Sequence, residues 1–334
     1  MVVSAAVALL FSSAHAANDD AASRYAPTPP VLYPGGVKSF RDVTYAELSG
    51  FRPLTLDLYL PPEDGKAKPA VVFVHGGAWR HRTARDGGTF RDFPAVLASV
   101  AARGYVVASV NYRLIGEARF PAAVQDVAMS IRWLRAHADK YHIDTKRFVL
   151  WGSSAGGQIA TLIGTACDAP ILEPAAASGD KPVVAAKPGS ACVQGVIDWY
   201  GIVDLASSAA DFGKSGPEAQ RRESAYLGCE ATQCPSDLVR SSSALSYIDA
   251  RDPPFLIQHG TADTSVSPKQ AQKLHDALRA AGVDSKLVLY PGVEHGFAKV
   301  PDGGPDDAVN RRALQDVFDF LTRHFDPGTP SVRE

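Results

Sequence analysis

Neither a basic nor an acidic excess marks this chain of 334 residues, in which 34 Lys and Arg stand against 36 Asp and Glu. The formal net charge of −2 gives no support to binding of nucleic acid or of an anionic membrane surface. After the N-terminal segment, no apolar run is long enough to cross a bilayer. The composition therefore favours neither a nucleic-acid-binding protein nor one that spans a membrane.

Cysteines are few, and no spacing of His and Cys suits a metal ion, so no metal site is predicted. The four that are present, Cys167, Cys192, Cys229 and Cys234, fit an exported protein. Pairing of nearest neighbours predicts the disulfides Cys167–Cys192 and Cys229–Cys234, which is one of three possible connectivities. Free buried thiols are the alternative.

The first residues have the pattern of a secretory signal. Val2 to Phe11 form a short apolar run, and Ala14-His15-Ala16 resembles a cleavage site. We therefore expect residues 1–16 to be a signal peptide and the protein to be periplasmic or secreted. No Lys or Arg precedes the apolar run, which departs from the pattern, and a buried N-terminal helix is the alternative. Residues 17–36, rich in Pro and Ala, are predicted to be a leader or linker.

The remainder reads as one α/β domain over residues 37–326, followed by a tail at 327–334. An apolar content of 46% is enough for a sizeable core. Two alternating segments, 37–47 and 54–60, predict an antiparallel edge hairpin. Buried strands are predicted at 70–75, 105–110, 147–151, 193–200, 254–259 and 285–290, with helices at 90–102, 122–137, 158–166, from 268, and at 306–324. This alternation predicts a mostly parallel sheet with right-handed crossovers.

A Gly-x-Ser-x-Gly motif follows the strand at 147–151. It reads Gly152-Ser153-Ser154-Ala155-Gly156 and leads directly into a helix. A strand, a sharp turn with a serine at its apex and a helix make a nucleophile elbow, in which the serine hydroxyl is exposed. The motif alone is weak, because it occurs by chance in loops rich in Gly and Ser. Its flanking elements predict Ser154 as a nucleophile.

Two glycines, Gly76 and Gly77, follow the buried strand at 70–75. Glycine lets backbone amides turn toward a ligand with no side chain in the way. We predict that these amides form an oxyanion hole together with the amide of Ala155, the residue after the nucleophile. An ordinary turn at the end of the strand is the alternative.

A base and an acid for Ser154 are predicted from chain order. Asp263 and His295 each come just after a predicted strand, in the order Ser, Asp, His that is typical of the α/β-hydrolase arrangement. His295 would activate the hydroxyl, and Asp263 would fix the imidazole tautomer. Asp204 is the rival for the acid.

Four other polar residues near these motifs are predicted to be structural. Arg113 and Asp126 would pair across a strand and the helix after it. His75 would act as a hydrogen-bonding residue within the oxyanion loop, and Glu294 would be solvated or would anchor the loop of His295.

Residues 201–243 form a long insertion after the strand at 193–200. Because it leaves from the carboxyl end of a strand, where α/β sheets bind their ligands, it is the candidate lid, tightened by Cys229–Cys234. We predict that Trp79, Ser153 and Tyr200 contact the substrate.

With these motifs assembled, residues 37–326 resemble the α/β-hydrolase serine esterases, and most closely the bacterial acetyl-xylan/feruloyl esterase-like group near the hormone-sensitive-lipase-like carboxylesterases. The carrying motifs are His75-Gly-Gly-Ala-Trp79, Asn111-Tyr-Arg113, Gly152-Ser-Ser-Ala-Gly156, Asp198-Trp-Tyr-Gly201, His259-Gly-Thr-Ala-Asp263 and Glu294-His-Gly-Phe297. Ala78-Trp79 departs from the third glycine of the lipase-like branch, which favours the polysaccharide-esterase side.

This resemblance implies a fold and an activity. The fold would be an eight-stranded type of sheet, mostly parallel, with helices on both faces and a lid insertion. The activity would be that of a serine carboxylesterase on short-chain or aromatic acyl esters, such as acetyl or feruloyl esters of plant polysaccharide, with no metal or organic cofactor. An arylformamidase-like amidase or a peptidase on the same scaffold, and a silent hydrolase fold used as a binding module, are the alternatives.

Overall fold

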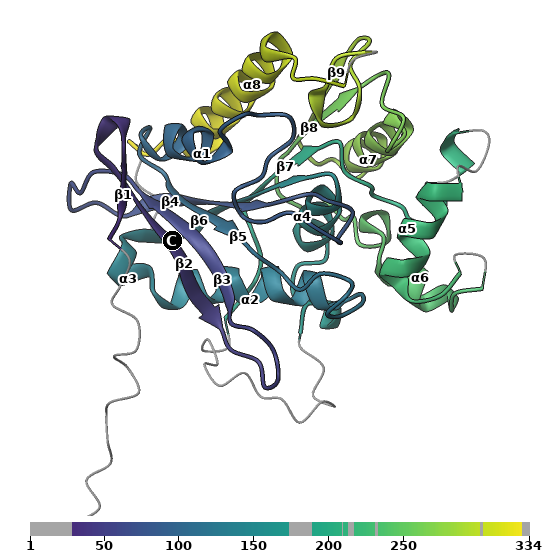
Figure 1. The fold of residues 1–334 in the computed structure, drawn as a ribbon, viewed down its shortest axis with the longest axis horizontal. Helices are drawn as coiled ribbons and strands as arrows, with labels where there is room; N and C mark the ends of the chain where they lie inside the picture. Colours follow the sequence, from purple (N-terminus) through teal and green to yellow (C-terminus); the bar gives the residue numbers. More distant parts are fainter. Residues whose placement is uncertain are drawn as a thin grey trace, which may run out of the picture.

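The computed structural model describes residues 29–173, 189–208, 210–212, 217–230, 233–300 and 303–328. The predicted signal peptide, most of the predicted leader and most of the predicted tail lie outside these residues. Within them, nine strands form one twisted sheet that runs through the molecule (Figure 1). The strands are β1 (Val31–Tyr33), β2 (Val37–Ala46), β3 (Leu54–Leu60), β4 (Lys68–Val74), β5 (Val106–Val110), β6 (Ile143–Ser153), β7 (Gly195–Trp199), β8 (Phe255–Gly260) and β9 (Ser285–Tyr290).

Strand order in the sheet is β1-β2-β3-β5-β4-β6-β7-β8-β9. The first three strands and the β3–β5 pair are antiparallel, and the other pairs are parallel. The predicted antiparallel hairpin is β2–β3, and the mostly parallel α/β sheet is confirmed. Strand β4 lies between β5 and β6 and runs parallel to both, so the carboxyl ends of β4 and β6 lie side by side. This places the loops that follow these two strands next to each other at the site.

The sheet has one strand more than the eight-stranded type that was predicted. The extra strand, β1, lies in the segment 17–36 that was predicted to be a leader, and it pairs with β2 through Leu32 opposite Lys38. Pro34-Gly35-Gly36 reverses the chain between the two strands, with Gly35 at a φ of 77°. A three-residue strand is too short to show an alternation of apolar and polar residues, so it cannot be predicted from the pattern of the sequence.

Helices cover both faces of the sheet. They are α1 (Phe93–Ala101), α2 (Ala122–Ala136), α3 (Ala138–Tyr141), α4 (Ala155–Thr165), α5 (Pro217–Leu227), α6 (Ser236–Ser241), α7 (Pro268–Ala280) and α8 (Asp307–Phe325). Alternate residues of β4 divide the core: Val71 and Phe73 belong to the part that includes residues of α1 and α8, whereas Val72 and Val74 belong to the part that includes residues of α2, α4 and α7. None of the helices in the described residues combines the length and apolar character that a membrane span needs.

Both predicted disulfides are present. Cys167–Cys192 joins the end of α4 to the segment before β7, at the end of α4 opposite the elbow. Cys229–Cys234 lies between α5 and α6, inside the insertion 201–243. The described parts of that insertion, chiefly α5 and α6, stand at one side of the sheet (Figure 1).

The predicted pair of Arg113 and Asp126 lies in the core beside β5 and α2. Asp126 has no solvent exposure, and its two oxygens accept hydrogen bonds from the Arg113 backbone amide, Nε and Nη2 at 2.6–3.0 Å. A buried carboxylate with a bidentate guanidinium partner is a satisfied structural group. The pair fixes the chain directly after Asn111 and Tyr112.

Candidate active site

The nucleophile elbow forms between β6 and α4. Ser154 has a φ of 54° and a ψ of −117°, which is a strained conformation for a residue with a side chain. A Cβ on Gly152 would lie 2.0 Å from the Gly156 oxygen, and one on Gly156 would lie 2.0 Å from the Val74 oxygen. Only glycine fits at both positions. Helix α4 begins at Ala155, three residues before the predicted start. Gly156 and Gly157 are poor helix formers, but tertiary packing overrides their low helix propensity.

Ser154, His295 and Asp263 meet at the carboxyl ends of β6, β8 and β9. The Ser154 Oγ lies 2.9 Å from His295 Nε2, and His295 Nδ1 lies 2.7 Å from Asp263 Oδ2. A carboxylate only accepts, so His295 Nδ1–H donates to it and Nε2 accepts from the serine hydroxyl. The rival acid, Asp204, instead accepts from Ser207 Oγ at 2.5 Å.

The Asp263 carboxylate is held by four donors. Oδ1 accepts from the amides of Ser265 and Val266 at 2.8 Å each, and Oδ2 accepts from His295 and from His259 Nε2, the latter at 3.1 Å. Burial alone would raise the pKa of Asp263, but the two imidazoles outweigh it and hold that pKa well below its usual range. The acid of this arrangement therefore stays ionised.

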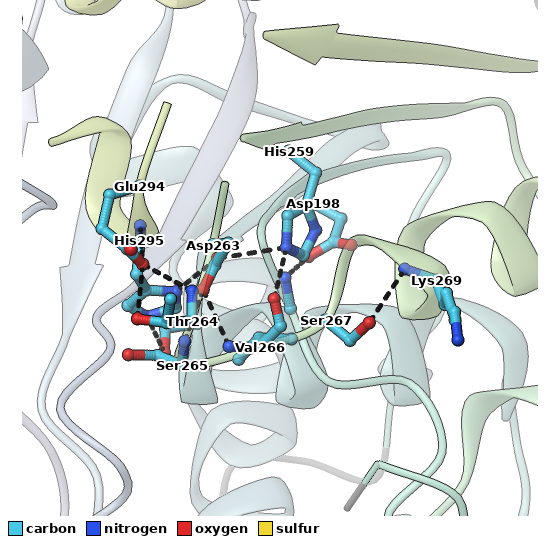
Figure 2. A network of polar contacts seen from close by, with 12 residues as sticks. Asp198, His259, Asp263, Thr264, Ser265, Val266, Ser267, Lys269, Glu294 and His295 are labelled. Atoms are coloured by element: carbon cyan, nitrogen blue, oxygen red, sulfur yellow. Dashed lines mark hydrogen bonds and ion pairs between the residues drawn. The ribbon is translucent and has the colours of Figure 1, made fainter. Parts of the chain in front are cut away.

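Behind the carboxylate lies a second imidazole that sequence reasoning left without a role. Figure 2 shows Asp263 between His295 on one side and His259 on the other, with Asp198 beyond. His259 Nε2 is shared with the Val266 carbonyl at 3.0 Å, and burial raises the pKa of Asp198 to about 7. Asp198 Oδ2 and His259 Nδ1 have no hydrogen-bond partner among the described residues. Asp198 and His259 each belong to a motif that the sequence shows, but the sequence does not show that they lie near each other in the fold.

Glu294 has the predicted anchoring place. Its Oε1 accepts from the backbone amide of Thr264 at 2.6 Å, from the Thr264 hydroxyl at 3.0 Å and from the His295 amide at 2.9 Å. It therefore ties the loop of Asp263 to the loop of His295 (Figure 2).

The loop after β4 brings the predicted oxyanion donors to the serine. A Cβ on Gly76 would lie 3.1 Å from the Ser154 Cβ, so the two backbones are in close contact. In the described turns and loops, no backbone hydrogen bond uses the amides of Gly76, Gly77 or Ala155. These three amides are free to donate to an oxyanion, as helix α4 begins at one of them.

His75 and Tyr112 shape this loop. The His75 ring stacks on the Tyr112 ring at 4.4 Å, its Nδ1 lies 2.8 Å from the Gly76 oxygen, and the Tyr112 hydroxyl donates to the His75 carbonyl at 3.0 Å. Burial lowers the pKa of His75 to about 4, so the ring is neutral near pH 7. His75 has the structural place that was predicted, and the Asn111-Tyr112-Arg113 motif is explained by its support of the loop.

A cavity of about 190 Å³ opens onto the serine and the histidine. Its lining is Gly76, Gly77, Ala78, His81, Arg82, Gly88, Thr89, Ser153, Ser154, Tyr200, Arg222, His295 and Gly296. Ser153 and Tyr200, both predicted to contact substrate, line it while being only 1% and 2% exposed. Their hydroxyls lie near each other without the geometry of a hydrogen bond, and neither has a partner in the described part of the chain. The Tyr200 ring also stands edge-on to His295, with centroids 4.9 Å apart.

Trp79 is not where it was predicted to be. It does not line the cavity and is 1% exposed, stacked on Tyr226 of α5 at 4.1 Å. Left-handed backbone at Ala78 and Trp79, with φ values of 52° and 57°, turns the indole under the insertion. Its Nε1 and the Tyr226 hydroxyl both donate to Gln158 Oε1, at 3.3 and 3.2 Å. The indole therefore joins the oxyanion loop, the elbow helix and α5.

Metal-binding geometry is found at one place in the described residues, Cys167, Asp168 and Cys192. Both thiols are consumed in a disulfide, so they supply no thiolate ligand. The group lies at the end of α4 opposite the elbow.

Comparison with known proteins agrees with this architecture. The BD-FAE family model matches residues 56–278. Esterase LipC of Mycobacterium tuberculosis is 31% identical over 239 residues, which are 70% of this chain and 54% of the relative. Esterase LipQ of the same organism is 27% identical over 84% of this chain and 61% of the relative, so the chain spans little more than half the length of these curated relatives.

Solved structures give the same result. A bifunctional GH43-CE protein of Bacteroides eggerthii superposes with a TM-score of 0.68 and 29% identity, over 86% of this chain and 38% of that one. A truncated carbohydrate esterase from gut microbiota gives a TM-score of 0.67 and 28% identity, over 86% and 95% of the two chains. The predicted kinship with the α/β-hydrolase esterases is thereby confirmed. With two thirds of its length matched by one family model, the chain belongs to the BD-FAE family.

Proposed function

We propose that the protein is a serine ester hydrolase, with Ser154 as nucleophile, His295 as general base and acid, and Asp263 as the carboxylate that orients the imidazole. The observation that carries the proposal is the continuous contact from hydroxyl to imidazole to carboxylate, at 2.9 and 2.7 Å. Relatives and structural neighbours that are named as esterases support the same reaction class.

The geometry supplies each step. Ser154 Oγ attacks the ester carbonyl while His295 Nε2 takes its proton, and the negative charge of Asp263 stabilises the imidazolium. The amides of Gly76, Gly77 and Ala155 hold the oxyanion, each worth about 3 kcal/mol of transition-state stabilisation in comparable sites. His295 then returns the proton to the leaving alcohol, and water clears the acyl group by the reverse route.

The substrate we propose is a short-chain or aromatic acyl ester, including acetyl or feruloyl groups on plant polysaccharide. The cavity of about 190 Å³ is small beside typical ligand pockets, which favours a small acyl group. Structural neighbours named as carbohydrate esterases support a sugar-linked alcohol. We also propose that α5, a helix of the insertion 201–243, covers the site, because it contributes Arg222 to the cavity wall.

Export is part of the proposal. Two disulfides fit an oxidising compartment, and they support a periplasmic or secreted location with residues 1–16 as signal peptide. Two measurements test this part. The mobility of the mature protein on a denaturing gel should change on reduction, and its N-terminal residue should be Ala17 after expression with export.

The central test is hydrolysis of 4-nitrophenyl esters from acetate to decanoate, with methyl ferulate and acetylated xylan beside them. We expect acetate to exceed decanoate in kcat/KM by at least about tenfold, which corresponds to about 1.4 kcal/mol in the barrier. Ser154→Ala should lose every one of these activities and its labelling by a fluorophosphonate, with an unchanged circular dichroism spectrum. Equal labelling of the folded Ser154→Ala variant would refute the nucleophile. Wild-type protein that takes no label would favour a silent binding module, and faster cleavage of anilides than of esters would favour an amidase.

A further inference from the structure

The cavity at the serine is bordered by positive charge. Arg82 and Arg222, whose side chains end in guanidinium groups, are among its lining residues, and so is His81. No Asp or Glu lines the cavity in the described residues. A cavity with charged groups of one kind attracts ligands of the opposite charge.

The two arginines approach from different elements. Arg82 lies in the loop after β4, at a φ of 79°, and Arg222 lies on α5 of the insertion. Each makes one hydrogen bond to a carbonyl, Arg82 Nη1 to Gly88 at 3.4 Å and Arg222 Nη2 to Ser265 at 3.0 Å. Their remaining donors are available to a ligand.

Neither arginine forms an ion pair with a carboxylate in the described parts of the chain. Arg85, only three residues after Arg82, shows the contrast, since its guanidinium bonds Asp57 and Asp42 at 2.7–2.9 Å. Carboxylates therefore lie near this loop, but they pair with Arg85 and not with the arginines of the cavity.

Two buried hydroxyls give a second, independent observation. Ser153 and Tyr200 are nine-tenths or more buried, line the same cavity and have no hydrogen-bond partner among the residues described. Buried polar groups without partners are costly, and they gather at functional sites. A ligand rich in acceptor oxygens satisfies the guanidinium groups.

We propose that the preferred substrate carries a carboxylate, bound by Arg82 and Arg222, while Ser154 attacks its ester bond. This rests on the proposed esterase function. The chemistry fits a half-ester of a dicarboxylic acid, with the charge on the acyl side, or an acyl ester on an acidic sugar, with the charge on the alcohol side. Guanidinium and carboxylate groups make paired hydrogen bonds, which favour the charged ester over a neutral one of the same shape.

Two pairs of matched esters test this. On the acyl side, monomethyl succinate is compared with methyl 4-methylpentanoate, in which an isopropyl group replaces the carboxylate. On the alcohol side, 4-acetoxybenzoate is compared with 4-acetoxybenzamide. Hydrolysis is followed by titration of released acid at pH 7.5 and low salt. We expect the charged member of at least one pair to have the higher kcat/KM, by about tenfold or more, and the pair that shows it tells which side of the ester bears the charge.

The variants Arg82→Gln and Arg222→Gln should each lower this charge preference by about threefold to tenfold, and 0.5 M NaCl should lower it in the wild type. Arg91→Gln is the matched control, since Arg91 is an exposed arginine outside the cavity lining, and its preference should equal that of the wild type. Equal rates for charged and neutral esters, or a preference that both cavity variants retain, would overturn the proposal. In that outcome, hydrolysis of the neutral esters that is lost in Ser154→Ala would leave the esterase function standing.

Discussion

Asp126 and Asp198 are two of the aspartates that have no solvent exposure, yet their surroundings are opposite. Asp126, on α2, is bonded by the guanidinium and the backbone amide of Arg113. Asp198, on β7 near Asp263, has one oxygen bonded by the Gly201 amide at 3.0 Å and the other without a partner in the described residues. Among the residues described, both oxygens of the Asp126 carboxylate are hydrogen-bonded, whereas one oxygen of the Asp198 carboxylate is not.

The difference follows the position of the candidate site. Around it, Ser154 and Tyr200 have left-handed backbone, and the Ser153 hydroxyl and His259 Nδ1 are unpaired in the part of the chain that is described. Strained backbone and unpaired buried polar atoms cost free energy, and they persist only where the rest of the fold offsets that cost. They are found most often at sites that bind a ligand or transfer a proton. We therefore expect changes in the Asp126 region to alter stability and changes in the Asp263–Asp198 region to alter activity.

The largest expected effect is that of Asp263→Asn. An asparagine of the same shape would offer its NH2 to His295 Nδ1, which imposes the opposite tautomer and turns Nε2–H toward Ser154. We expect kcat for a short ester to fall by about 10⁴-fold, or about 5.5 kcal/mol in the barrier, as in comparable triads. The melting temperature should move much less than for a change at Asp126.

Asp204→Asn is the matched control for this change. Asp204 bonds Ser207 and does not touch His295, so its substitution should leave kcat within about twofold. A larger loss of kcat in Asp204→Asn than in Asp263→Asn would reverse the assignment of the acid and remove the distinction between the two regions.

Next in size is Asp126→Ala. The substitution leaves the largely buried guanidinium of Arg113, with 14% of its side chain exposed, without its carboxylate. Loss of one partner of a buried ion pair typically costs about 3–5 kcal/mol. Urea unfolding should show this decrease in the free energy of unfolding, while kcat of the folded protein at 20 °C stays within about fivefold. Removal of both charges, in Arg113→Met with Asp126→Leu, should recover most of the stability. A loss of activity with unchanged stability would show that this pair belongs to the site.

Much of the fold could be predicted because its signals are local. The central strands are continuous apolar runs, and Gly152 and Gly156 mark the elbow whatever surrounds them. Chain order, together with the place of each residue just after a predicted strand, brought Ser154, Asp263 and His295 into one hypothesis. The three-residue β1 was missed because so short a strand has no period, and the start of α4 was placed late because Gly156 and Gly157 are poor helix formers.

What the sequence could not predict depends on contacts between distant segments. Trp79 is an aromatic residue next to the oxyanion loop, which suggests contact with substrate, but it is buried by its contacts with Tyr226 and Gln158. These two residues come from the insertion and from the elbow helix. Likewise, His259 has a role only because Asp263 folds back on it at 3.1 Å. Periodicity reports which face of an element is apolar and is silent on which partner meets it.

The smallest expected effect concerns the pH dependence that Asp198 gives to stability. Its pKa is raised to about 7 by burial, whereas an unfolded aspartate has a pKa of about 3.9. Between these values the folded protein keeps a proton that the unfolded chain loses, so stability falls as pH rises from about 4 to about 7, and is level above that. Asp198→Asn keeps the acceptor for Gly201 and has no proton to lose.

The quantity to measure is the difference in the free energy of unfolding between Asp198→Asn and the wild type, from urea titrations at pH 5 to 8. It should shift in favour of the variant by about 2–3 kcal/mol over this range, at about 1.4 kcal/mol per pH unit below pH 7. Other buried groups, such as His75 and Glu223, whose pKa values burial moves to about 4 and about 7, are common to both proteins and cancel. Parallel curves would mean that Asp198 is already ionised in the folded protein. The contrast between the two buried aspartates would then not extend to their titration.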